Sequence, residues 1–288
     1  MFDYQGAFAR NIGWLREDEQ QVLRSKRVAI AGMGGVGGVH LLTLARLGIG
    51  RFNIADLDNF ELANFNRQAG ASMSTLGRPK VEVMAEAARE INPELELGIF
   101  RDGVNESNLD AFFDGVDVYV DGLDFFSFDI RERVFAYCAE KGIPAVTVAP
   151  LGMSAALLNF LPGEMTFEEY FQVAGRPDLE KAVRFLVGLA PALQHRHYLA
   201  DKTRVSLESG AGPSTVMACQ LCAGVAGIEV LKLLLGRGKV WAAPHGIQYD
   251  GYRNKLAHTW RPGGNRNPLN RLAIAIAMRQ LGLGHRRG

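Results

Sequence analysis

The chain has 288 residues, more than an average domain but within the range of large α/β domains, and its 48% apolar content allows a sizeable core. Its formal net charge of +1 gives no overall indication of a nucleic-acid or membrane partner. The three cysteines are too few and too unevenly placed for a disulfide framework, and the sequence shows neither a signal peptide nor an apolar run that could span a membrane, so we expect a cytoplasmic protein.

The first half of the chain predicts a Rossmann-type sheet. Residues 1–26 are expected to form an arm with a helix. The next elements are predicted in the order strand (28–31), glycine-rich turn (32–37), helix (39–47) and strand (51–56). A strand, a glycine turn, a helix and a strand that ends in an acid are typical of the nucleotide-binding half of such a sheet.

The glycine turn predicts a phosphate site. It contains Gly32, Gly34, Gly35 and Gly37, which permit a tight turn and close approach of the backbone to a ligand. The following helix directs its free amides and positive dipole end toward the same point. Asp56 ends the second strand, where a carboxylate can accept hydrogen bonds from ribose hydroxyls. The alternative is a strand-to-helix turn with no ligand.

Two cations favour ATP over a dinucleotide as that ligand. Arg67 follows the second strand, and Lys80 begins the next predicted helix, at 78–92. A guanidinium binds phosphate oxygens as a bidentate fork, and an ammonium adds a point charge. A dehydrogenase has no need for either group beside its ribose acid. Ordinary surface charge is the alternative for both residues.

An acid after the fourth strand predicts a magnesium site. A strand at 94–100 and a helix at 105–113 precede this strand, which begins at 116 and leads into Asp121-Gly-Leu-Asp124. The carboxyl ends of parallel strands face the ligand crevice, so Asp124 is placed to hold Mg²⁺ between ATP phosphates. Its alternative role is to cap a helix over 126–141, and one carboxylate could do both.

The remaining elements are expected to extend and cover the sheet. They are strands 145–149 and 153–160, a helix at 179–189, an apolar helix at 213–235, an antiparallel hairpin of 246–250 with 255–260, and a tail helix near 267–282. We therefore predict an α/β fold with a mostly parallel sheet and helices on both faces. Its parts are an arm (1–26), an ATP-binding core (27–162), a crossover insertion (163–212), a C-terminal helix with antiparallel strands (213–262) and a basic tail helix (263–288).

The tail and the possible metal ligands leave alternatives open. No acidic residue follows Asp250, so the tail either docks with a solvated basic face or contacts an acidic partner or an RNA backbone. His195 and His197 lack nearby ligands and are interpreted as solvated or packing residues. Tetrahedral zinc needs four ligands, and the only cysteines are Cys138, Cys219 and Cys222, so zinc is not expected. Whether any cysteine does chemistry stays open.

Four motifs, in this order and spacing, resemble the MoeB/ThiF/ubiquitin-activating enzyme superfamily. They are Gly32-Met-Gly34-Gly35-Val-Gly37, Asp56-Leu-Asp58, Asn64-Phe-Asn-Arg67-Gln68 and Gly77-Arg-Pro79-Lys80. The resemblance implies adenylation of a substrate carboxylate with MgATP by a homodimer. Often this carboxylate is the C-terminus of a ubiquitin-like protein.

The resemblance also implies roles for single residues. The four glycines, Asp56 and Asp58 would bind the nucleotide; Asn64, Arg67, Gln68 and Lys80 would bind its phosphates; Asp124 would hold Mg²⁺; and Arg10 would reach the ATP of the neighbouring subunit. Solvation of the docked arm is the alternative for Arg10. The family's asparagine after the magnesium acid is replaced by Phe125, so any polar contact it makes is in doubt.

Three further hypotheses change the substrate or the reaction. The crossover has no cysteine, so a thioester from the usual place is not expected, and the motifs also resemble TcdA, which activates a carboxylate on modified tRNA. An NAD(P)-binding oxidoreductase could use the same glycine turn. A non-catalytic nucleotide-binding scaffold would leave the set of site residues without a use.

Overall fold

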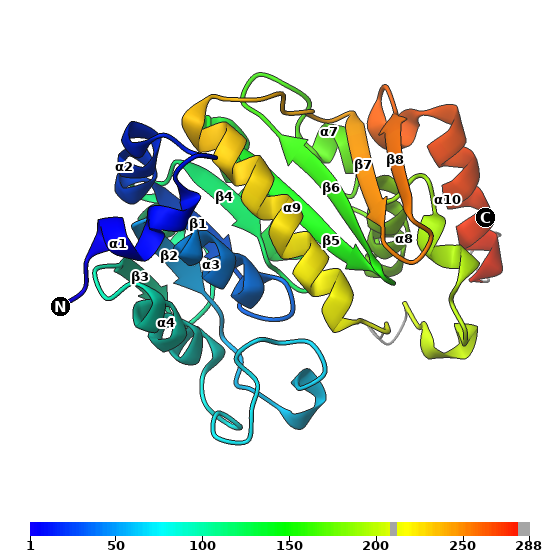
Figure 1. The fold of residues 1–288 in the computed structure, drawn as a ribbon. Helices are drawn as coiled ribbons and strands as arrows, with labels where there is room; N and C mark the ends of the chain where they lie inside the picture. Colours follow the sequence, from blue (N-terminus) through cyan, green and yellow to red (C-terminus); the bar gives the residue numbers. More distant parts are fainter. Residues whose placement is uncertain (208–211, 282–288) are drawn as a thin grey trace.

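The computed structural model describes residues 1–207 and 212–281, and eight strands in this part of the chain form one sheet (Figure 1). Their order across the sheet is β3-β2-β1-β4-β5-β6-β7-β8. The bounds are β1 Arg27–Ala31, β2 Arg51–Ala55, β3 Glu96–Phe100, β4 Val118–Asp121, β5 Ala145–Leu151, β6 Ser154–Phe160, β7 His245–Asp250 and β8 Lys255–Trp260. Strands β1 to β5 pair in parallel and β6 to β8 are antiparallel. The antiparallel hairpin of β7 and β8 was predicted, whereas the antiparallel direction of β6 was not.

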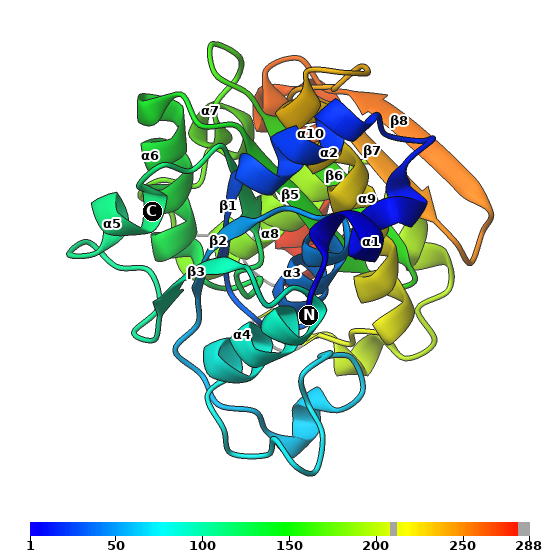
Figure 2. The ribbon, with the colours of Figure 1, turned by 60° about the vertical axis from the view of Figure 1, so that its left-hand side comes forward.

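Helices cover both faces of this sheet, which Figures 1 and 2 show from two sides. Their bounds are α1 Tyr4–Phe8, α2 Glu17–Ser25, α3 Gly37–Arg46, α4 Lys80–Ile91, α5 Leu109–Phe113, α6 Phe128–Lys141, α7 Phe167–Phe171, α8 Asp178–Leu189, α9 Val216–Leu235 and α10 Pro268–Gln280. Helices α3, α4 and α9 pack on one face, and α5 to α8 pack on the other. The predicted fold class is thus confirmed.

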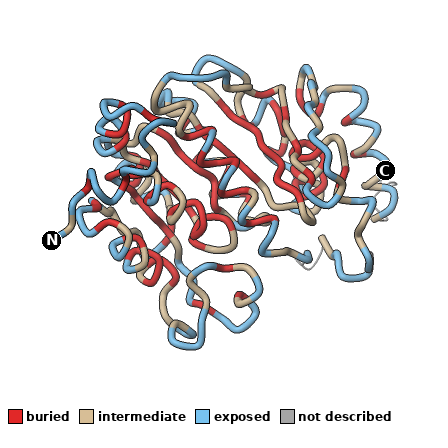
Figure 3. Tube along the Cα trace, viewed as in Figure 1, coloured by how far each residue is buried: buried red, intermediate tan, exposed pale blue. Residues whose placement is uncertain are grey.

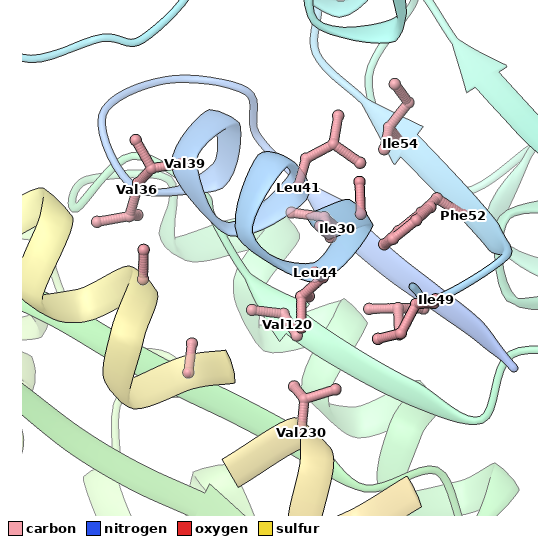
Figure 4. Packing of buried hydrophobic residues seen from close by; sticks show 14 of the residues in the cluster. Ile30, Val36, Val39, Leu41, Leu44, Ile49, Phe52, Ile54, Val120 and Val230 are labelled. Carbon is pink, nitrogen blue, oxygen red and sulfur yellow. The ribbon is translucent and has the colours of Figure 1, made fainter. Parts of the chain in front are cut away.

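The central strands are buried on both faces, which explains why their sequences are almost continuously apolar (Figure 3). Successive side chains of a strand point to opposite faces. Ile30 of β1 therefore packs with Phe52 and with Leu44 of α3 (Figure 4), whereas Ala29 faces Tyr119 and the aromatic cluster around α6 to α8. The sheet fixes the carboxyl ends of its parallel strands at one edge.

Helix α9 is by length and composition apolar enough to cross a membrane, but half of its apolar window is buried inside the protein. It packs on β5, β6 and α3 through its own buried residues Ala223, Ala226 and Val230, which belong to the core. This is the packing of a core helix. The small residues on its inner side let it approach α3 closely, as at Gly227, which faces Thr43.

Several element bounds differ from the prediction. Helix α5 begins at Leu109 rather than near Asn105, because the Asn105 carboxamide accepts from the amide and hydroxyl of Ser107 and holds a turn. The short helices α1 and α7 were not predicted. The tail helix α10 packs on α8 through Ile274. The predicted tail extends beyond it to residues such as Arg286 and Arg287, which lie outside the described part.

Candidate nucleotide-binding site

The glycines of the turn after β1 divide into two pairs with different surroundings. Gly32 has φ +88°, and a Cβ there would lie 2.2 Å from the carbonyl oxygen of Gly122; at Gly37 it would lie 1.7 Å from that of Gly32. These contacts between backbones leave no space for a side chain. Gly34 is more open, since the nearest atom to an added Cβ is Gln68 Nε2 at 3.6 Å. The first pair shapes the turn, and the second, Gly34 with Gly35, borders the space where a ligand could approach.

Asp56 is tied directly to this turn. Its Oδ2 accepts a 2.6 Å hydrogen bond from the amide of Met33, and its Oδ1 accepts one of 2.8 Å from the amide of Asp58. Burial raises the pKa of the Asp56 carboxyl, against the two amides and the charge of Lys80, which lower it. The end of β2 therefore presents its acid beside the glycines, as the predicted ribose role requires.

Lys80 is the first residue of α4, and it is buried. Its Nζ lies 2.9 Å from Oδ2 of Asp58, and its own amide donates to the Asp58 carbonyl oxygen at 2.9 Å. Pro79 precedes it as the N-cap, where a missing amide costs little. The structure thus brings Lys80, Asp58 and Asp56 together within one corner of the site.

The segment around Arg67 lies over the turn from the other side. An added Cβ on Gly35 would lie 3.6 Å from Arg67 Nε, and the guanidinium donates to Asn66 Oδ1 and to the carbonyl oxygen of Ala63. Gln68 is 7% exposed, and its Oε1 finds no hydrogen-bond partner among the described residues. A buried polar atom without a partner is costly, which is consistent with a group held for a ligand.

Asn64 has a local role in the same segment. Its Oδ1 accepts from the amide of Glu61 and so closes the short turn Leu62–Asn64. It is buried beside Gln68, but the structure shows no further task for it. Its phosphate role stays a prediction.

Two helix N-termini converge on the turn. Helix α3 starts at Gly37, and Cys219, in the first turns of α9, would lie 3.2 Å from a Cβ on Gly35. Asn66 Nδ2 also donates to the carbonyl oxygen of Ser214, just before α9. The positive ends of both helices add to the charges of Arg67 and Lys80, and such an arrangement favours an anion. Sequence analysis missed the contribution of α9.

The cysteines are all buried side chains. Burial raises the pKa of the Cys219 and Cys222 thiols, which disfavours the thiolate form. Cys138 lies in α6 on the opposite face of the sheet. No cluster of three or more His, Cys, Asp or Glu side chains suited to a metal occurs in residues 1–207 and 212–281.

Asp124 follows β4 at the same edge of the sheet. Its carboxylate is exposed, and Oδ1 accepts from the amide of Phe126 at 3.0 Å, so it stabilises the turn before α6. The N-cap itself is Ser127, not Asp124, because α6 begins at Phe128. An exposed carboxylate oxygen at this edge is a hard ligand of the kind Mg²⁺ prefers, so Asp124 fits a metal that is also bound by phosphates. The side chain of Phe125 packs against Phe185 and offers no polar group in place of the family's asparagine.

A buried ion pair below this loop was not predicted. Arg131 of α6 donates through Nε to Oδ2 of Asp121 at 3.0 Å, and both residues are at most 4% exposed. Thr147 of β5 donates to the same oxygen at 3.0 Å. Gly122, which lies between Asp121 at the end of β4 and Asp124, also packs against the backbone of Gly32. An acid at a strand end and an arginine on the next helix were the signals available in the sequence.

Arg10 is not brought to the site of its own chain. The arm is fastened at the far end of α3, where Asn11 Nδ2 donates to the carbonyl oxygen of Leu47 and Tyr4 contacts Gly48. Helix α3, roughly 15 Å long, separates this end from the glycine turn. A cavity of about 600 Å³ opens beside the arm and holds none of the predicted site residues.

The crossover histidines do not form a metal site with each other. His195 is partly buried beside Gly152, and desolvation lowers its pKa to about 4, whereas His197 is exposed. The same segment is held to the sheet by Tyr198, whose hydroxyl donates to Asp250 Oδ2 and accepts from the amide of Met153. These residues anchor the crossover at the carboxyl edge.

Relatives in the curated proteins match about half of the chain. The tRNA threonylcarbamoyladenosine dehydratase of Bacillus subtilis is 34% identical over 141 residues, which cover 49% of this chain and 55% of that protein. The molybdopterin-synthase adenylyltransferase of Escherichia coli is 31% identical over 143 residues, 50% of this chain and 57% of that protein. The chain thus spans about half the length of the curated relatives it matches.

Solved structures share the fold across most of the chain. E. coli MccB with ATP has a TM-score of 0.64 at 19% identity and covers 88% of this chain and 70% of its own. E. coli TcdA, a tRNA N6-threonylcarbamoyladenosine dehydratase, has a TM-score of 0.59 at 23% identity, with 81% and 95% covered. A sequence model of the ThiF family matches residues 8–271, and the chain belongs to the ThiF family.

Proposed function

We propose that this protein adenylates a carboxylate with MgATP. The observation that carries the proposal is that two cations flank the glycine turn: Arg67 lies beside Gly35, and Lys80 pairs with Asp58. Asp58 is joined through its amide to Asp56, whose carboxylate accepts from the amide of Met33 in the turn. A dinucleotide needs the glycines and the acid but not the two cations. The relatives support the proposal, since one is an adenylyltransferase by name and another was solved with ATP.

In the proposed reaction, a carboxylate oxygen of the substrate attacks the α-phosphorus of ATP, and the bond from that phosphorus to the bridging oxygen of pyrophosphate breaks. The products are an acyl-adenylate and pyrophosphate. Arg67, Gln68 and Lys80 hold the phosphates, and Asn64 supports their segment. Such a reaction asks mainly for positioning and neutralisation of charge. Mg²⁺, bound by Asp124 and the phosphates, would neutralise the charge of the leaving pyrophosphate.

The first candidate substrate is the C-terminal tail of a ubiquitin-like protein. The MoeB-like relative supports it. The crossover has no cysteine, and Cys219 is a buried thiol, so the adenylate would pass to its acceptor without a thioester on the crossover. This proposal needs only that the crossover cover an extended tail at the sheet edge.

The second candidate is a carboxylate on modified tRNA, which two of the named relatives support. A specific feature also favours it: residues 251–281 contain no acid and six cations, and none of the six forms an ion pair within the described chain. The cations are Arg253, Lys255, Arg261, Arg266, Arg271 and Arg279. Unpaired cations on one segment are suited to a phosphate backbone.

We further propose that the protein acts as a homodimer in which Arg10 reaches the ATP of the partner subunit. Arg10 is exposed on an arm fastened far from the glycine turn of its own chain, which supports a role in another subunit. A symmetric dimer would supply one such arginine to each of two sites.

Pyrophosphate exchange tests the proposal and separates the substrates. Radiolabelled pyrophosphate should enter ATP only when the correct carboxylate is present, because exchange requires reversal of adenylate formation. The arms are a ubiquitin-like protein with a free C-terminal glycine, the same protein with its C-terminus amidated, and threonylcarbamoylated tRNA. If none of the three substrates supports exchange and ATP binding does not depend on Mg²⁺, the proposal is contradicted.

A further inference from the structure

The loop that carries Asp124 is held by a single buried side chain. Arg131 is 2% exposed and donates four hydrogen bonds. Its Nε binds Asp121, and its two terminal nitrogens bind the carbonyl oxygens of Leu123 at 2.9 Å, Asp124 at 2.8 Å and Phe125 at 3.1 Å. One guanidinium therefore fixes three successive peptide groups, with Asp124 at the centre.

The carboxylate of Asp121, which pairs with Arg131, is also held by several hydrogen bonds. Asp121 accepts from Arg131 and Thr147 through Oδ2 and from the amide of Leu123 through Oδ1. The face of the guanidinium is covered by Phe185 of α8, at 4.8 Å from the ring centre. Burying two charges is expensive, and a well-packed apolar pair would often be as stable. Stability alone therefore gives a weak reason for a buried pair at this place.

We propose that Arg131 is a positioning residue that sets the carboxylate of Asp124 for Mg²⁺, through its three bonds to the backbone of residues 123–125. The inference rests on the proposed function, because it concerns the same metal and nucleotide. Arg131 does not touch the metal or ATP itself. It acts on the loop backbone. Without it the loop keeps the Leu123 amide bond to Asp121 and the Phe126 amide bond to the Asp124 carboxylate. The Asp124 carbonyl oxygen also keeps its bond from the Ser127 amide.

Arg131→Lys is the sharpest test. A lysine can keep the ion pair with Asp121, but an ammonium with three N–H groups cannot reproduce the fork that spans three carbonyls. The Mg²⁺ concentration for half-maximal ATP binding, measured by calorimetry, should rise about tenfold, as is usual when a partner that orients a metal ligand is removed. AMP binding without Mg²⁺ should stay within about twofold of wild type, because the glycine turn and Asp56 are unchanged.

A readout without nucleotide comes from hydrogen exchange. The Leu123 amide should exchange faster in Arg131→Lys than in wild type, whereas the amides of β1 should not. Asp124→Asn serves as the benchmark, since it should raise the Mg²⁺ requirement and leave the Leu123 amide protected. This difference separates the loss of the ligand from the loss of its support.

Lys181→Met is the matched control for a looser contact between α6 and α8. Lys181 of α8 bridges Asp129 and Glu132 of α6, close to Arg131, but contacts none of the three carbonyls. The Lys181→Met variant should have a lower Tm than wild type but the same Mg²⁺ requirement. If Arg131→Lys fails to fold, Thr147→Val decides, because it removes one bond to Asp121 and should raise the Mg²⁺ requirement in the same direction by a smaller factor.

The outcomes are distinct. A Mg²⁺ requirement equal to that of wild type in folded Arg131→Lys, or in Thr147→Val if the lysine variant does not fold, would overturn the positioning role. Wild-type protein that binds ATP without any dependence on Mg²⁺ would instead overturn the proposed function. A raised Mg²⁺ requirement with faster exchange at Leu123 supports the inference.

Discussion

The ammonium of Lys80 lies 2.9 Å from Oδ2 of Asp58, and the two side chains differ sharply in exposure: 8% for Lys80 and 58% for Asp58. The cation is held in place by an acid that can return to water. A phosphate that enters the site can therefore take over the ammonium without leaving Asp58 buried and unpaired. The pair is suited to a site that must be loaded and emptied.

Replacement of Lys80 should separate activity from stability. In Lys80→Met, pyrophosphate exchange should fall by about a hundredfold or more, because a charge that stabilises the developing transition state is lost. The free energy of unfolding should change by less than about 1 kcal/mol, since the partner acid is exposed. Urea denaturation and exchange measure the two effects. Arg78→Met, which breaks the exposed pair with Glu86, is the control and should leave both unchanged.

Two glycines of one turn should respond in opposite ways to alanine. Gly37→Ala places a Cβ 1.7 Å from the carbonyl oxygen of Gly32, so it should destabilise the fold by several kcal/mol. Gly34→Ala meets nothing closer than 3.6 Å and should fold with a normal Tm, but its methyl group should weaken ATP binding. Thermal unfolding and calorimetry distinguish the two. Equal losses of stability would show that the turn is packed differently.

Mixed dimers test the role of Arg10 in the partner's site. Arg10→Ala and Arg67→Ala should each be inactive alone. Random mixing of subunits should restore about a quarter of wild-type exchange, because half the dimers are mixed and each of these contains one intact site in a symmetric two-site arrangement. Activity of Arg10→Ala alone, or no recovery in refolded mixtures with confirmed subunit exchange, would contradict a shared site.

His40 should make stability depend on pH. It is fully buried in α3, neither ring nitrogen has a partner among the described residues, and burial lowers its pKa from 6.5 to about 3. The unfolded state therefore binds the proton more readily. Stability should be complete above pH 6.5 and should fall as the pH drops toward 3, by about 2 kcal/mol at pH 5 for this residue.

The measurement is urea denaturation of wild type and His40→Leu at neutral pH and at pH near 5. The variant should lose less stability between the two conditions, because it has no imidazole to protonate. His197→Gln, at an exposed position, should follow wild type. Parallel pH profiles for His40→Leu and wild type would show that His40 does not carry the effect.

The sequence predicted those parts of the site that depend on local order. Gly32 to Gly37, Asp56 and Lys80 each lie at the end of a strand or the start of a helix, and parallel strands bring such ends to one edge. The contacts of Arg131 could not be predicted, because most of its hydrogen bonds go to backbone carbonyl oxygens, which every sequence contains. The contact of α9 with Gly35 joins residues that lie about 180 positions apart in the sequence, Gly35 and Cys219, and no local sequence pattern predicts it.

Some limits of elements also depend on interactions that periodicity does not show. The sequence offered helix capping as the alternative role of Asp124, but Ser127 is the N-cap because α6 starts two residues later than predicted. The family match runs through the hairpin to residue 271, although the four motifs end at Lys80. Antiparallel pairing of β6 to β8 with the core explains this extension, since those strands complete the same sheet.

Calorimetric titration with ATP and with NAD⁺, each with and without Mg²⁺, tests the central claim most directly. The account predicts ATP binding that strengthens with Mg²⁺ and no measurable binding of NAD⁺, because, of these two ligands, only ATP with its metal has groups that would engage Arg67, Lys80 and Asp124 together. Binding of NAD⁺ alone, with no effect of Mg²⁺, would contradict these assignments and would direct the search to hydride transfer.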